Sequence, residues 1–133
     1  MTMRMSFGNV PPDMLVGAVE KLLAKMDETD LAAVYERELS MMPHDAGAAF
    51  VEALFEAFRD RGESSEDAAE GAGIALDSIV RREPPAISAL LAYARTSPDL
   101  LKEATTIFIE RRPDFVESLP AVLRNAVAER LGA

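Results

Sequence analysis

The sequence predicts an all-α protein, a compact bundle of six to seven short amphipathic helices. Apolar residues recur with the helical period along nearly the whole chain, and no stretch of four or more residues alternates strictly between apolar and polar with β-branched content. Alanine, which loses no side-chain entropy in a helix, occurs 22 times among the 133 residues. This length suits one core, so we expect a single helical domain at 10–133 after a flexible N-terminus at 1–9.

Three helices are expected in the first half of the chain. The first runs from about Pro12, a residue suited to the first helical position, to Met26. The acidic group at 27–30 supplies the N-cap and first turn of the second helix, which Pro43 ends. The third, from about Asp45 to Arg61, carries the widest apolar stripe and is expected to be central.

Proline, glycine and capping residues divide the second half in the same way. The segment Ser64-Ser65-Glu66-Asp67 is typical of a capping box, and the helix that it opens is expected to break near Gly71 and Gly73. A short helix then covers Ile87 to Ala94, and Ser97-Pro98-Asp99 is expected to start the next one. In the final apolar segment, from Phe115 to Leu131, Pro120 is expected either to kink the helix or to divide it after Ser118.

Charge is distributed unevenly along the chain. Residues 1–80 hold 16 acidic and 6 basic side chains, whereas residues 81–133 hold 7 and 8. A negative body repels the phosphate backbone of nucleic acids, whose neutralisation by Lys and Arg supplies most non-specific affinity. We therefore expect no nucleic-acid partner, although the acidic region could meet a basic protein.

Residues 66–82 resemble a bacterial helix-turn-helix. In that family a small residue lets two helices cross closely, a glycine four residues later makes the turn, and an aliphatic residue six further on holds the second helix. Ala69, Gly73 and Ile79 stand at those spacings, and the helix that precedes them, from Phe50, is similar to the first helix of TetR-type regulators. The resemblance covers about 33 of 133 residues and implies a DNA-reading helix near Arg81 and Arg82.

The positions that would face DNA depart from this pattern. A recognition helix needs polar side chains toward the major groove and usually a Ser or Thr that grips phosphate. Those positions hold Ala75, Leu76, Asp77, Val80 and Arg81. Three interpretations stay open: an alanine-rich helical hairpin, a helix-turn-helix fold that does not bind DNA, and a DNA-reading module.

Catalytic and metal-binding motifs are missing from the sequence. There is no cysteine, His44 is the sole histidine, and no strand precedes the Gly71-x-Gly73 pair that a dinucleotide site would need. Met41, Met42 and His44 could join Met1, Met3 and Met5 in binding Cu(I), but a methionine pair packed in the core is the simpler interpretation. We therefore expect no enzyme, no cofactor and no metal.

The helices carry more apolar surface than one layer needs, which is typical of interaction domains. The candidate interaction residues are Phe55, Leu76, Val80 and Ile109. We predict a cytoplasmic protein-interaction or regulatory domain, without a membrane segment, that binds itself as a homo-oligomer or binds a protein partner. The alternative is a divergent transcription regulator that uses the helix-turn-helix-like segment.

Overall fold

The computed structural model describes residues 10–130, and this part of the chain consists of helices joined by short turns, without a strand, as the sequence predicts. Seven of its α-helices have eight residues or more, and α5 is shorter. The predicted flexible segment 1–9 and residue Leu131 lie outside the described residues. The elements are α1 (Pro12–Lys25), α2 (Glu28–Glu38), η1 (Leu39–Met41), α3 (His44–Asp60), α4 (Ser65–Ala72), α5 (Leu76–Val80), α6 (Pro84–Ala94), α7 (Leu100–Arg111), η2 (Pro113–Ser118) and α8 (Ala121–Arg130).

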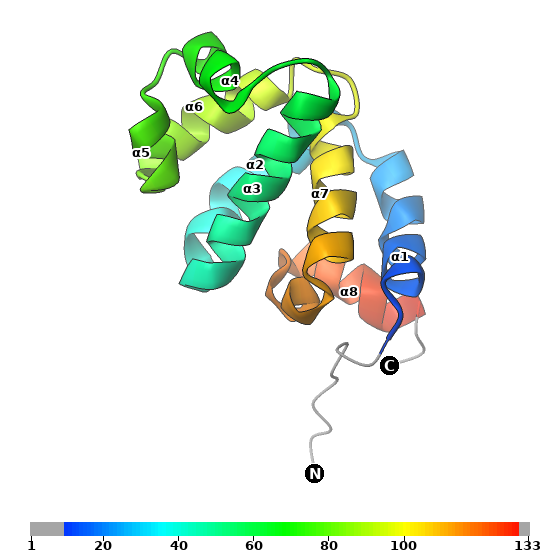
Figure 1. The fold of residues 1–133 in the computed structure, drawn as a ribbon. Helices are drawn as coiled ribbons and strands as arrows, with labels where there is room; N and C mark the ends of the chain where they lie inside the picture. The colour runs from blue at the N-terminus through cyan, green and yellow to red at the C-terminus, as the bar shows by residue number, and fades with distance from the viewer. Residues whose placement is uncertain (1–9, 131–133) are drawn as a thin grey trace.

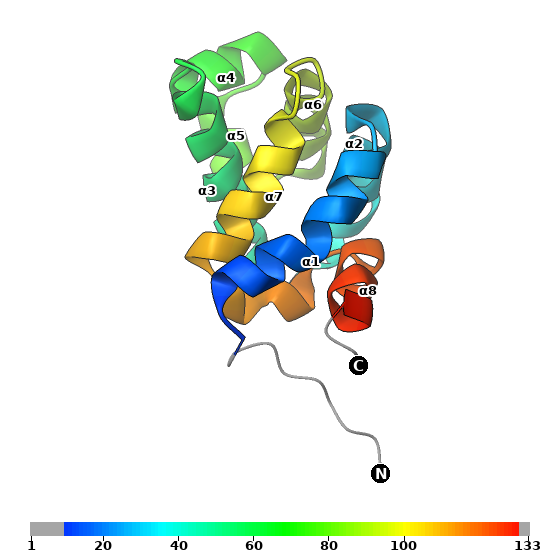
Figure 2. The same ribbon diagram turned by 90° about the vertical axis from the view of Figure 1, so that its right-hand side faces the viewer.

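Helices α3 and α7 lie side by side at the centre and make the most extensive contact in the structure (Figure 1). They run antiparallel, since Arg61 at the end of α3 pairs with Glu103 near the start of α7 at 2.6 Å, and Glu56 pairs with Arg111 at the end of α7. Turning the molecule shows α2 on the other side of α7 from α3 (Figure 2). Helices α1 and α8 pack together at one end, and α4, α5 and α6 form a corner at the other.

Large aromatic side chains fill the space between α2, α3 and α7. The ring of Tyr35 stacks on Phe50 with centroids 4.1 Å apart, and Phe50 meets Phe108 edge to face at 5.8 Å. Thr105 donates its hydroxyl hydrogen to the Leu101 carbonyl, so the buried Tyr35 hydroxyl, 2.6 Å from Thr105 Oγ1, is the donor of that second bond. Burial raises the pKa of Tyr35 far above its ordinary value, and the tyrosine stays neutral.

Local capping residues begin several helices where the sequence predicts. Asp27 accepts a hydrogen bond from the Asp30 amide at 2.8 Å at the start of α2. Ser64 and Asp67 form the reciprocal capping box of α4, with both bonds at 3.1 Å. Pro120 separates η2 from α8, which confirms the predicted division of the last segment.

Helix α7 is the exception, and its predicted start at Ser97-Pro98-Asp99 is wrong. The helix begins at Leu100, after Asp99 in a left-handed conformation with φ 60° and without a side-chain cap. One of its first amides is instead satisfied from α2, because the Leu101 N–H donates to Glu28 Oε2 at 3.2 Å. Glu38, at the other end of α2, accepts from the Ala121 N–H at 3.1 Å and so caps α8.

Two of the predicted interaction residues, Phe55 and Ile109, belong to the core, which corrects that prediction. Their exposed fractions are 4% and 0%. The physical reason is that α3 and α7 are covered on several sides, α3 by α7, α4 and α5, and α7 by α3, α1 and α2. A helix surrounded in this way buries apolar residues outside its main stripe.

The break predicted near Gly71 and Gly73 is present, and each glycine has its own cause. Gly73 ends α4 in the left-handed conformation with φ 74°. Gly71 lies against Tyr93 of α6, where an added Cβ would come within 2.6 Å of the tyrosine hydroxyl. The Tyr93 ring is held by stacking on Phe58 at 5.6 Å and by a 2.6 Å hydrogen bond that its hydroxyl donates to Glu63. This bond raises the pKa of Tyr93.

Candidate functional site

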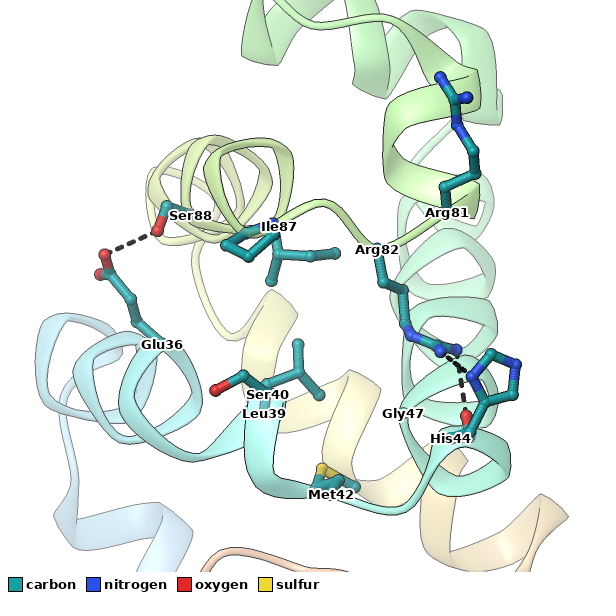
Figure 3. Close-up of a pocket in the computed structure, with 11 residues that line it drawn as sticks. Glu36, Leu39, Ser40, Met42, His44, Gly47, Arg81, Arg82, Ile87 and Ser88 are labelled. Carbon is teal, nitrogen blue, oxygen red and sulfur yellow. Dashed lines mark hydrogen bonds between the residues drawn. The ribbon is translucent and has the colours of Figure 1, made fainter.

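The candidate site is a groove between the end of α2, the start of α3 and the connection from α5 to α6. Its volume is about 450 Å³. Leu39, Met42 and Ile87 form its apolar floor, and Figure 3 shows Leu39 and Ile87 facing one another across it. Glu36 lies on one wall, bound by the Ser88 hydroxyl at 2.8 Å, while Arg82 lies on the opposite wall and the side chain of Arg81 points away from the hollow. The groove is therefore apolar at the bottom and oppositely charged along its two sides.

A second hollow of about 350 Å³ adjoins the groove, and Met42 lines both. Met41 lines the second hollow and is 69% exposed, so the prediction that it packs in the core is wrong. Met42 is half-buried, so the same prediction holds only in part for this residue. The pair does not continue the apolar stripe of α2, because α2 ends at Glu38 and the 3₁₀ turn η1 follows it. The other methionines of the suggested Cu(I) site, Met1, Met3 and Met5, lie outside the described residues.

Arg82 ties the two sides of this groove together. Its guanidinium donates to the His44 carbonyl oxygen at 3.0 Å and contacts His44 Nδ1 (Figure 3). Its aliphatic stem passes over Gly47, where an added Cβ would lie 3.6 Å from Arg82 Cδ. His44, expected to be an exposed loop residue, is exposed but is the first residue of α3. The Arg82–His44 contact thus joins the α5–α6 connection to the N-terminal end of α3.

Arg82 also has an uncommon backbone conformation, with φ 54°. The Arg82 amide donates to the Ile79 carbonyl at 2.8 Å and the Glu83 amide to the Ser78 carbonyl at 3.1 Å, which is the Schellman pattern that ends a helix. The same pair of bonds ends α3 at Gly62 and α4 at Gly73. A left-handed residue with a side chain costs about 1–2 kcal/mol more than the right-handed form, and glycine avoids that cost.

The helix-turn-helix-like segment folds into two helices joined by a turn. Ala69 and Ile79 are buried and Gly73 makes the turn, as the resemblance implies for these three positions. The second helix, α5, has only five residues. Arg81 pairs with Asp77 at 2.9 Å and with Glu83 at 3.3 Å, so both arginines of the motif are held by groups of the protein.

The remaining predicted interaction residues, Leu76 and Val80, lie on α5. Leu76 is half-buried against the core, while Val80 is 62% exposed. Val80 is therefore not part of the buried side of α5, which carries the fully buried Ile79. Val80 directly precedes Arg81 in the groove wall.

Sequence reasoning missed most of the groove. Its residues come from four separate elements, and no local spacing marks them as neighbours. The one available signal is the run Met41-Met42-Pro43-His44, in which adaptable thioethers and the sole histidine follow a helix end.

Two kinds of site are not found in the described part of the chain. Within residues 10–130, no cluster of three or more histidine, aspartate or glutamate side chains could hold a metal ion. None of the helices there combines the length and hydropathy needed to cross a bilayer. Comparison with protein-family models, with curated proteins and with solved structures finds no match to this chain.

Proposed function

We propose that this chain is a protein-interaction domain that associates with a second copy of itself through the groove face, without catalysis. One observation carries the proposal. The two most exposed large apolar side chains of residues 10–130, Met41 and Val80, each directly precede a groove-lining residue, Met42 and Arg81. Exposed apolar side chains that flank an apolar hollow and are bordered by charges are typical of an interaction site.

The charge pattern favours a second copy as the occupant. A twofold interface brings the same surface of two subunits together, so each wall of the groove meets the opposite wall of the partner. Such an arrangement would place Glu36 of one copy near Arg82 of the other, twice over. Because the chain has a formal charge of −9, two copies repel each other unless the contact surface offers local complementarity of this kind.

Sedimentation equilibrium between about 1 and 100 μM tests the proposal, since a weak to moderate dimer dissociates in this range. We expect a monomer–dimer equilibrium for the parent, and mainly monomer for Met41→Glu and Val80→Glu. Met14→Glu is the matched control, because Met14 is 53% exposed on α1, which does not line the groove. A parent that stays monomeric at 100 μM, or a control that weakens the dimer as much as the groove variants, would contradict the proposal.

The second candidate function is a DNA-binding regulator, favoured by the positions of Ala69, Gly73 and Ile79. It requires α5 to act as a recognition helix, although α5 has five residues and its neighbouring arginines are already engaged. A gel-shift experiment with duplex DNA at low salt separates the two functions. We expect no shifted band, whereas tight binding that weakens as salt rises would favour the regulator.

A further inference from the structure

We propose that a second groove, between α1 and α8, docks a short acidic peptide segment of a partner protein. This α1–α8 groove shares no lining residue with the groove proposed for self-association, and the inference does not depend on that proposal. Its volume is about 380 Å³. The apolar residues that line it are Ala18, Leu22 and Ala126. The charged residues that line it are three exposed cations and one exposed carboxylate, Lys21, Lys25, Arg130 and Glu129.

The charge of this groove is opposite to that of the chain, whose formal charge is −9. None of the three cations forms an ion pair within residues 10–130. The C-terminal ends of α1 and α8 favour a cation in the last helical turn, which accounts for Lys25 and Arg130. It does not account for Lys21, which lies one turn earlier. The groove therefore presents cations that can pair with the carboxylates of a ligand.

The apolar surface of the groove continues along both helices. Met14 lies one turn before Ala18 on α1, and Val122 lies one turn before Ala126 on α8. Residues four positions apart share a helix face. The side chains of Met14 and Val122 are 53% and 39% exposed, although both are large and apolar. An apolar strip edged by cations suits an amphipathic helix whose polar face is acidic.

A peptide fits this surface better than an anionic membrane or a nucleic acid does. Segments that bind anionic membranes use clusters of about 4–8 Lys or Arg, and nucleic-acid sites neutralise several phosphates. The groove has three cations and one carboxylate. The formal charge of −9 would also repel an extended polyanion, whereas a short peptide meets mainly the local charge, because salt screens beyond about 8 Å.

Titration with a synthetic peptide tests the proposal, with ¹H–¹⁵N amide shifts of the protein as the readout. The probe is a capped helical peptide of about twelve residues with leucine on one face and glutamate on the other. We expect shifts centred on α1 and α8 and a dissociation constant between about 10 μM and 1 mM. Peptides with glutamine for glutamate, or alanine for leucine, should bind about threefold more weakly or worse. No binding at about 2 mM of the first peptide, or shifts centred elsewhere, would overturn the proposal.

Lys21→Glu is the matched protein variant, because the residue is exposed and lines the groove. It replaces an attraction with a repulsion, so the acidic peptide should bind about three- to tenfold more weakly. Arg95→Glu is the control, since it changes the net charge equally at an exposed residue outside the groove, and it should bind the peptide like the parent. Equal losses in the two variants would mean that the peptide responds only to net charge, which would refute the proposal.

The same two variants distinguish the other occupants. Vesicles of phosphatidylcholine with about 30% phosphatidylserine should not co-sediment the protein. Co-sedimentation that Lys21→Glu abolishes would assign the groove to a membrane surface instead. The dimer dissociation constants of Lys21→Glu and Arg95→Glu should be equal, and a weaker dimer for Lys21→Glu alone would make the groove an interface between copies. Either of the last two results would overturn the proposal.

Discussion

The centre of the bundle and the α4–α5 corner are held together in different ways. Between α2, α3 and α7, large aromatic rings stack and meet edge to face, and all of them are buried. At the corner the buried side chains of α4 and α5 are two alanines and one isoleucine, Gly71 lies against Tyr93, and one arginine reaches a histidine. The burial of large side chains stabilises the first region. In the second region, helices that approach closely at small residues and a few polar contacts provide the stability.

The groove borders this corner, since Arg81 and Arg82 of its lining directly follow α5. A region packed with large side chains resists rearrangement, since small shifts there lose many contacts. A region that depends on one short helix and a few hydrogen bonds opens at a lower free energy. Surfaces that change on binding are expected in the second kind of region, and the following substitutions test the contrast.

The largest effect is expected for Phe50→Ala. This ring is fully buried and contacts both Tyr35 and Phe108, so its removal should lower the free energy of unfolding by about 3–5 kcal/mol. Urea denaturation measures the loss. Phe115→Ala, which removes a half-buried ring from the edge of the same cluster, should lose less, and the reverse order would contradict the contrast.

Gly71→Ala should destabilise by about 1–3 kcal/mol, although alanine is the better helix former, because the new methyl group would overlap Tyr93. Gly17→Ala is the matched control. It lies inside α1 with no atom within 4 Å of an added Cβ, and it should stabilise by up to about 1 kcal/mol. In a Tyr93→Ala background the penalty at Gly71 should disappear, and thermal unfolding of the four proteins would show whether it does.

Glu28→Ala should lower stability by about 0.5–2 kcal/mol, because the Leu101 amide loses its acceptor, whereas Glu28→Gln keeps an oxygen there. Burial raises the pKa of Glu28, and its Oε1 has no partner within residues 10–130. Since the pKa of Glu28 is raised in the folded state, ionisation of this carboxyl favours unfolding. The stability that Glu28 contributes is therefore greatest in acid and is lost as the pH rises through the folded-state pKa. The stability of the Gln variant relative to the parent should therefore increase from pH 4 to pH 7 in denaturation curves. A constant difference would contradict the buried environment.

The smallest effect is expected for Val80→Glu. The side chain is mostly exposed, so the free energy of unfolding of the monomer should change by less than about 0.5 kcal/mol. The same charge at half-buried Leu76 should lower the melting temperature clearly. Differential scanning calorimetry at a concentration where the parent is monomeric compares the two, and equal losses would mean that α5 is buried on both sides.

Much of the fold could be predicted from the sequence because its signals are local. The caps at Asp27 and Ser64, the breaks at Gly73 and Pro120 and the apolar stripes all depend on neighbours within one or two turns. The start of α7 could not be predicted, since its acceptor is Glu28, 73 residues earlier. The burial of Phe55 and Ile109 likewise depends on which helices surround α3 and α7.

The candidate site could hardly be predicted at all. Val80 and Leu76 were found as surplus apolar residues on a helix, and Arg81 and Arg82 as part of a motif. Their relation to Met42 and His44 exists only after folding, because it joins residues about forty positions apart. Sequence patterns with a period of a few residues carry no information on such a pairing.

The two carboxylates at the ends of α2 have a consequence for how the chain folds. Glu28 and Glu38 supply acceptors to α7 and α8 across 73 and 83 residues, so neither helix start is complete until α2 has docked. A chain cut after α6 would leave the second fragment with uncapped helices, and its helices would fray. Folding is therefore expected to be a single cooperative event that waits for long-range closure, slower than is usual for a helical bundle of this size. The Leu101 and Ala121 amides should exchange with solvent only when the whole molecule unfolds.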